Sequence, residues 1–181
     1  MFTKNPTLLV VLLLATAIAS PTLANCQQHG NHAAANNFPP SVFQGLVEDY
    51  LAIQTALAED TIEGVADHAR SIEKSAHDLS SAFDLTAAGV SGKDSDTLKE
   101  TLPDLAGAAG ELSRAGDLDA TRKSFGALSD AMIVYRELVS GEKPKVAYCS
   151  MTKQSWLQDG NKIANPYFGS AMLRCGSIVE K

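Results

Sequence analysis

Apolar residues recur at three- and four-residue steps through most of the chain from Ser41 onward, and this spacing restricts the fold more than any other feature. In a helix, such steps place the apolar side chains on one face. Four stretches carry the pattern: Phe43, Leu46, Val47, Tyr50, Ile53 and Leu57; Ile62, Val65, Ala69, Ile72, Ala76, Leu79 and Phe83; Leu98, Leu102, Leu105, Ala109 and Leu112; and Leu118, Thr121, Phe125, Leu128, Met132, Tyr135 and Val139. They show almost none of the alternation typical of strands, so each is predicted to be an amphipathic helix.

Residues that start or interrupt helices separate these stretches. Asp60-Thr61-Ile62-Glu63 has the form of a capping box, which predicts that the second helix begins at Asp60. Residues 84–95 contain two glycines and few large apolar groups, and they are predicted to be a loop. Pro103 predicts a kink in the third helix or a late start near Leu102. Asp117 is predicted to cap the fourth helix.

Four such helices joined by short turns predict an all-α fold, a four-helix up-and-down antiparallel bundle over residues 41–140. Beyond it, residues 141–181 form a C-terminal tail that contains two cysteines, two methionines and the single tryptophan. This tail is predicted to be largely irregular and to pack on the bundle through Trp156, with room for one short strand near residues 145–149.

The N-terminal segment has the layout of a secretory signal peptide. Lys4 precedes an apolar run at residues 8–19, and small residues follow. We therefore expect residues 1–24 to be removed on export to the periplasm and residues 25–40 to be a flexible linker. Cys26 offers an alternative, a lipid-anchored protein of the outer membrane, although Asn25 fits a lipidation site poorly.

The charge balance bears on the partners. The formal net charge is −6, and it becomes −7 when the signal peptide takes Lys4 with it. Binding to nucleic acid needs a clustered basic face that neutralises phosphates. The sequence has no such cluster, so nucleic acid is not expected as a partner. The mature chain also has no apolar run near the ~20 residues of a membrane-spanning helix.

The tail places a thiol and a thioether side by side twice, in Cys149-Ser150-Met151 and in Met172-Leu173-Arg174-Cys175. Thiolate and thioether sulfurs are soft ligands that suit Cu(I). In an oxidising compartment, however, two such cysteines often pair. Closing this loop would stabilise the fold by about 3 kcal/mol in the chain-entropy account. Spacing and compartment together favour the disulfide and leave the metal site open.

Catalysis is not predicted. Thiol oxidoreductases commonly carry a Cys-x-x-Cys pair, and nucleophilic cysteines need a nearby base. The chain has no such pair, and no histidine lies near Cys149 or Cys175 in the sequence. We therefore expect a binding or structural protein rather than an enzyme.

The same residues resemble a known family, domain of unknown function 3347. The resemblance covers about residues 41–178, and the tail carries it in Tyr148-Cys149-Ser150-Met151, Trp156-Leu157-Gln158, Ile163, Asn165-Pro166-Tyr167-Phe168-Gly169, Met172-Leu173 and Cys175-Gly176. The helical region resembles the family at residues 50–60 and 122–129. One departure is Ser150, where the family pattern has proline.

Similar domains occur appended to periplasmic adaptor subunits of heavy-metal efflux pumps. The resemblance therefore implies a role in handling metal, with copper as the expected ion and efflux adaptor or pump components as partners. Carried over by position, it implies Cys149, Met151, Met172 and Cys175 as the metal ligands. It also shifts the balance from a plain disulfide toward a Cu(I) site, because a disulfide alone does not explain a methionine beside each cysteine.

Overall fold

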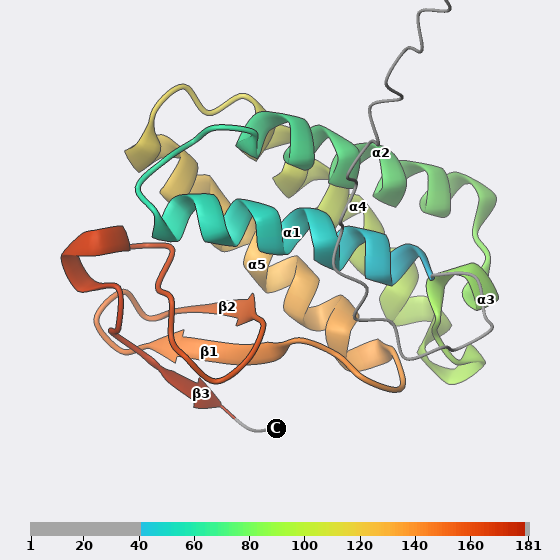
Figure 1. Ribbon diagram of the computed structural model, residues 1–181. Coiled ribbons are helices and arrows are strands. Elements are labelled where there is room, and N and C mark those ends of the chain that lie inside the picture. Colours follow the sequence, from blue (N-terminus) through green and yellow to red (C-terminus); the bar gives the residue numbers. More distant parts are fainter. Residues whose placement is uncertain (1–40, 180–181) are drawn as a thin grey trace, which may run out of the picture. The chain divides into compact units, whose positions relative to one another are not determined.

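Helices make up most of residues 41–179, which are the part of the chain described by the computed structural model (Figure 1). The helical elements are α1 (Val42–Ala58), α2 (Val65–Ala82), the short α3 (Leu85–Ala88), the 3₁₀ turn η1 (Gly92–Asp94), α4 (Ser95–Ser113) and α5 (Leu118–Leu138). The prediction of a mostly helical protein is confirmed. The predicted signal peptide, the linker and Cys26 lie outside the described residues.

Capping explains where two of the long helices begin. Ser41 and Gln44 form a reciprocal capping box at the start of α1. The Asp117 side chain accepts a hydrogen bond from the Ala120 backbone N–H at 2.8 Å, as predicted for the start of α5. The predicted start of the second helix at Asp60 is wrong, because α2 begins at Val65. Asp60 has a left-handed backbone (φ 60°), and its carboxylate serves a tertiary contact instead.

The third long helix also starts earlier than predicted. α4 begins at Ser95 and continues through Pro103, so the expected late start near Leu102 is wrong. A proline inside a helix costs about 3 kcal/mol through a lost hydrogen bond and a steric clash. Leu98, Leu102 and Leu105 are all fully buried, and their burial offsets that cost. The predicted loop at residues 84–95 is partly ordered as α3 and η1.

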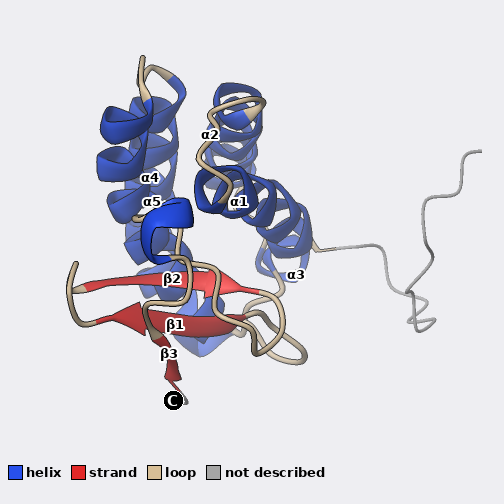
Figure 2. Cartoon of the chain, turned by 60° about the vertical axis from the view of Figure 1, so that its left-hand side comes forward, coloured by secondary structure: helices blue, strands red, loops and turns tan. Residues whose placement is uncertain are grey.

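The long helices pack in sequence, α1 on α2, α2 on α4 and α4 on α5. Aromatic rings join the first and last of them, since Tyr50 stacks on Phe125 with ring centroids 5.1 Å apart. Strand β2 (Gln154–Gln158) packs against α5 and also contacts α1. The strands lie together below the helices in Figures 1 and 2. The fold is therefore helical with a small sheet attached, and a regular four-helix bundle is not confirmed.

The tail is more ordered than predicted. Strand β1 (Lys145–Cys149) pairs antiparallel with β2 and with β3 (Ser177–Val179), in the order β2-β1-β3. The expected strand near residues 145–149 is confirmed, and β2 and β3 are strands that the sequence did not predict. The sequence of β2, QSWLQ, does not alternate apolar and polar residues, and β3 has only three residues, so hydrophobic periodicity reveals neither strand.

Two tyrosine hydroxyls fasten the outer edge of β2 to the rest of the fold. The Tyr50 hydroxyl accepts a hydrogen bond from the Leu157 N–H at 3.1 Å, and the Tyr167 hydroxyl donates to the Ser155 carbonyl at 2.8 Å. Ser129 lies between the two hydroxyls, 2.6 Å from Tyr50. Burial raises the pKa of both tyrosines well above the usual value, so both stay protonated. The Leu157 N–H and the Ser155 carbonyl, which face away from β1, thereby have hydrogen-bond partners.

Within residues 41–179, no helix has the length and apolar character needed to cross a membrane.

Candidate functional site

The sheet brings the two tail cysteines together. Cys149 is the last residue of β1, and Cys175 lies two residues before β3. Tyr148 of β1 pairs with Ser177 of β3 in antiparallel fashion. Cys149, which follows Tyr148, therefore lies close to Cys175, which precedes Ser177 by two residues. The two Sγ atoms are 3.1 Å apart, and both cysteines are free thiols. Cys149 is buried and Cys175 is partly exposed, so the pair is open to solvent from one side.

The turn after β1 surrounds the sulfur of Cys149 with hydrogen-bond donors. These are the backbone N–H groups of Thr152 and Met151, the thiol of Cys175 and the hydroxyl of Thr152. The Thr152 hydroxyl also accepts from the Gln154 N–H at 3.3 Å, which fixes its orientation. Burial alone would raise the pKa of Cys149, but these donors outweigh it and lower the pKa to about 7.

The partner thiol behaves in the opposite way. Its hydrogen bond to Cys149, followed by burial, raises the pKa of Cys175. Near neutral pH, Cys149 therefore loses its proton more readily than Cys175. A thiolate is the form that binds metals and attacks disulfides, so the two sulfurs have different chemical roles.

The two methionines predicted as ligands flank the pair on separate turns. Met151 lies in the turn between β1 and β2, and its side chain is 62% exposed. Met172 is half-buried at the end of the 3₁₀ turn η2 (Gly169–Met172). Of the four predicted ligands, the structure thus places Cys149 and Cys175 in contact and leaves the Met151 thioether largely in solvent. Within residues 41–179, His, Cys, Asp and Glu side chains form no group of three or more that could hold a metal.

Trp156 supports the cysteine pair from inside the fold. Its ring is fully buried, and its Nε1 donates a hydrogen bond to the Gln158 side chain at 3.1 Å. The residue after Cys175 is Gly176, whose backbone is left-handed (φ 138°). A Cβ atom at Gly176 would lie 2.7 Å from the Trp156 ring. Trp156 therefore packs the tail, as predicted, and only a glycine leaves room for it beside Cys175.

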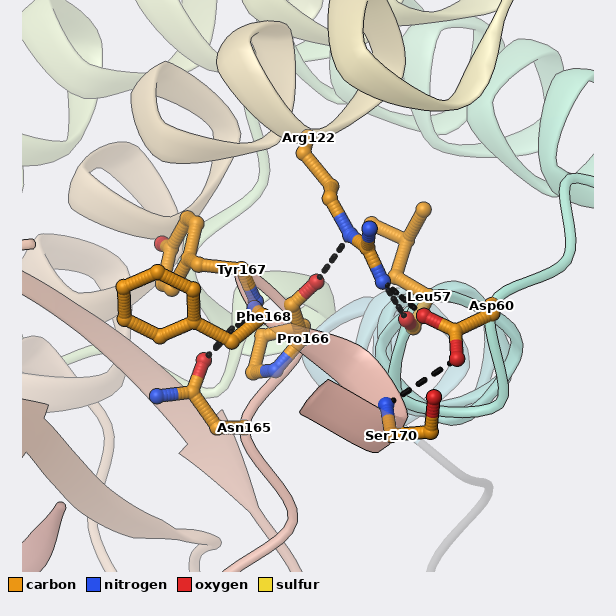
Figure 3. Close-up of polar contacts among 8 residues, drawn as sticks. All are labelled: Leu57, Asp60, Arg122, Asn165, Pro166, Tyr167, Phe168 and Ser170. Atoms are coloured by element: carbon orange, nitrogen blue, oxygen red, sulfur yellow. Dashed lines mark hydrogen bonds and ion pairs between the residues drawn. The ribbon is translucent and has the colours of Figure 1, made fainter. Parts of the chain in front are cut away.

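Asn165 connects the cysteine pair to the Asn-Pro-Tyr turn. Its buried side-chain amide donates to the Cys175 carbonyl at 2.7 Å. Its Oδ1 accepts from the N–H groups of Tyr167 at 2.8 Å and Phe168 at 3.3 Å. Figure 3 shows Asn165 directed at this turn. The side chain thus fixes the main chain of Cys175 as well as the turn, a role that spacing alone could not reveal.

An ion pair fastens the same turn to the helices (Figure 3). Arg122 on α5 donates to the carbonyls of Pro166 and Leu57, each at 2.9 Å, and to the Asp60 carboxylate at 2.5 Å. The Ser170 N–H donates to the other oxygen of Asp60 at 3.0 Å. One arginine therefore links the end of α1, the start of α5 and the tail.

Sequence reasoning missed this ion pair. Asp60 and Arg122 lie 62 residues apart, and no local pattern connects them. Both fall inside the helical segments that resemble the family, and this is the one signal that singles them out. Gly169 completes the contact, because its left-handed backbone (φ 55°) lets the tail pass directly beside the Asp60 and Arg122 side chains.

Acid should weaken this ion pair in a defined range. Hydrogen bonds from Ser170 and then from Arg122 lower the pKa of Asp60 from 3.8 to about 2. The stabilisation is therefore complete above the unfolded-state pKa, near 4, and is lost as the pH falls toward 2. We expect Asp60→Asn to be less stable than the unmodified protein at pH 7 and the gap to close between about pH 4 and pH 2. Melting temperatures across this range measure the gap, and a gap that does not change with pH would contradict the assignment.

Comparison with known proteins places the chain in a family. A family described as "Protein of unknown function (DUF3347)" matches residues 46–143, more than half of the sequence. The matched range spans the helices from within α1 to beyond α5 and ends before β1, so the two tail cysteines lie outside it. No match was found among curated proteins or among solved structures. The chain belongs to the DUF3347 family.

Proposed function

We propose that this protein is a non-enzymatic metal-binding domain that holds Cu(I) between the thiolates of Cys149 and Cys175. The observation that carries the proposal is the approach of the two sulfurs to 3.1 Å at the end of β1. The donors around Cys149 favour its thiolate near neutral pH, and a thiolate is the form required for binding.

The ligand set favours Cu(I) over a harder or more highly coordinated ion. Structural zinc takes four ligands from cysteine, histidine and carboxylates. In the described part of the chain, no three side chains of His, Cys, Asp or Glu lie close enough together to hold one ion. Two thiolates with neighbouring thioethers match the soft ligands that Cu(I) prefers. With metal–thiolate bonds of about 2.3 Å, two sulfurs on one ion lie at most about 4.6 Å apart. The pair therefore opens by no more than about 1.5 Å to admit the ion.

The methionines supply the next ligands in this proposal. Met172 is half-buried three residues before Cys175, and Met151 is exposed two residues after Cys149. Because Met151 lies in a turn with a free side chain, rotation about its own bonds can bring the thioether to a bound ion. We expect the two cysteines to supply most of the affinity and the methionines to add to it.

Copper binding to the reduced protein tests the proposal. The unmodified protein is expected to take one Cu(I) per chain from a coloured Cu(I) chelator, as read by the absorbance of the chelator complex. Cys149→Ser and Cys175→Ser each remove an anionic ligand and are expected to abolish this uptake. The double variant Met151→Leu, Met172→Leu is expected to weaken uptake about tenfold, since each thioether adds a weaker contact than a thiolate.

Met132→Leu is the matched control, because Met132 is a buried core residue of α5 and the replacement conserves its volume. It should bind copper as the unmodified protein does. Uptake by the two cysteine variants equal to that of the unmodified protein would contradict the proposal, and so would no uptake by the fully reduced protein.

The cellular role follows from the same proposal. We infer export to the periplasm, with cleavage after residue 24, and a function beside heavy-metal efflux or resistance components. An exported Cu(I)-binding domain could deliver its ion to an efflux adaptor or report copper to it. Mass spectrometry of the exported protein tests the proposed processing, because cleavage after residue 24 and a lipid on Cys26 give different masses.

A second candidate is a structural or interaction domain with a Cys149–Cys175 disulfide and no metal. The close approach of the sulfurs favours it, since only a small movement is needed for a bond. The closed loop would stabilise the protein by about 3 kcal/mol, or roughly 10 °C in melting temperature. Melting the oxidised protein with and without a reductant measures this difference. A melting temperature that the reductant does not change would exclude a stabilising Cys149–Cys175 disulfide.

A further inference from the structure

The sulfurs of Cys149 and Cys175 differ in exposure and in their hydrogen-bond donors, and a purely structural disulfide does not require such a difference. Cys149 is buried, and its sulfur is surrounded by the N–H groups of Met151 and Thr152 and the hydroxyl of Thr152. Cys175 is partly exposed and lies beside Gly176, at the open side of the pair. An incoming thiolate can therefore reach the sulfur of Cys175, and attack there makes the enclosed sulfur of Cys149 the leaving group.

We propose that Cys149 and Cys175 are a reversible thiol–disulfide couple that exchanges with small thiols, with Cys175 as the entry sulfur and Cys149 as the leaving sulfur. This goes beyond the proposed copper site, although it uses the same two residues, and it requires no metal. It also separates the couple from a structural staple, which would resist reduction by such thiols.

The exchange proceeds in two balanced steps. A thiolate RS⁻, formed from a small thiol RSH, attacks Cys175 Sγ in the oxidised pair. The Cys149–Cys175 bond breaks, and its electron pair leaves on Cys149 Sγ as a thiolate. A second RS⁻ then attacks the R sulfur of the mixed disulfide, forming RSSR and releasing Cys175. The protons from two RSH return to the two cysteines, so one disulfide is reduced while two thiols are oxidised.

The turn after β1 assists the first step. Hydrogen bonds to the leaving thiolate favour bond cleavage and stabilise the reduced form. The Thr152 hydroxyl is the replaceable donor among them. It also accepts from the Gln154 N–H at 3.3 Å, so its proton is free to point at the sulfur. Thr152 is therefore a positioning residue for the couple, acting through the sulfur of Cys149.

Equilibration of the full chain in metal-free glutathione buffers tests the couple. The fraction of reduced protein is measured by alkylating the free thiols and determining the masses of the products by mass spectrometry. We expect the fraction to change across the range of reduced and oxidised glutathione ratios. Thr152→Val is expected to shift this equilibrium about tenfold toward the disulfide, the effect of one hydrogen bond to a charged group. Thr152→Ser keeps the hydroxyl and should restore the unmodified behaviour.

Thr97→Val is the matched control, an exposed threonine on α4, and it should leave the equilibrium unchanged. Circular dichroism verifies that each variant is folded. A pair that remains oxidised in every buffer would overturn the couple, and so would equal shifts for Thr152→Val and Thr97→Val. Because no metal is present, failure here is distinct from failure to bind copper.

The entry sulfur is identified by trapping. At a pH high enough to ionise both thiols, oxidised glutathione should form a mixed disulfide with Cys175 in the Cys149→Ser variant faster than with Cys149 in the Cys175→Ser variant, because Cys175 is partly exposed and Cys149 is buried. Peptide mass spectrometry locates and times each adduct. Faster modification of Cys149 would reverse the assigned roles and contradict the mechanism.

Discussion

Replacing Gly169 with alanine is expected to lower the free energy of unfolding by about 3 kcal/mol or more. A non-glycine residue in the left-handed region costs about 1–2 kcal/mol by itself. An added Cβ would also lie 2.7 Å from the Asp60 carboxyl carbon and would force the Asp60–Arg122 ion pair apart. The Arg122 hydrogen bonds to the Leu57 and Pro166 carbonyls would be disturbed with it. Urea denaturation measures the change.

Gly107→Ala is the matched control. Gly107 is an exposed residue of α4, and a Cβ atom there would meet nothing within 4 Å. Alanine in a helix interior is favoured over glycine by about 0.5–1 kcal/mol, so this variant should be slightly more stable. If both alanine variants gave the same small effect, Gly169 would not be needed for the contact between the tail and the helices.

The second large effect is expected at Trp156. Trp156→Ala should lower the free energy of unfolding by about 3–5 kcal/mol, because it removes a fully buried ring and leaves a cavity. It also deprives Gln158 of the hydrogen bond from Nε1. The ring packs edge-on against Tyr167, with centroids 6.1 Å apart, so the Asn-Pro-Tyr turn should loosen as well. Urea denaturation gives the loss.

Tyr148→Ala provides the comparison for Trp156. Tyr148 is on the neighbouring strand β1, but its side chain is 36% exposed, so its removal creates no enclosed cavity. We expect a loss of about 1 kcal/mol or less. A loss at Trp156 no larger than that at Tyr148 would show that the tail does not depend on the buried ring.

The helices could be predicted because their signal is local. The six positions of the first stretch and most of the seven of the fourth are apolar and recur at helical spacing, and helix formation follows from that spacing. The errors arose where a tertiary contact outweighed a local preference. Asp60 looked like an N-cap, but it pairs with Arg122 across 62 residues. Pro103 looked like a helix start, but buried leucines on both sides hold α4 through it.

The site was predictable only in part for the same reason. The two cysteines were singled out by residue type and compartment, and the structure places them in contact. Sequence could not show that Thr152 and the Met151 N–H surround one sulfur, or that Asn165 holds the main chain of the other. These contacts depend on turns whose geometry exists only after β1 pairs with β2 and β3. The roles of the methionines remain predictions.

The fastening of β2 by tyrosine hydroxyls has a consequence for encounters between molecules. An exposed sheet edge can recruit a strand from another copy and begin aggregation. Along β2, the Leu157 N–H and the Ser155 carbonyl are already bound to Tyr50 and Tyr167. An incoming strand would have to displace these two hydroxyls to pair there. Within residues 41–179, the opposite edge is defined by the three residues Ser177–Val179, so this sheet offers other copies little to extend.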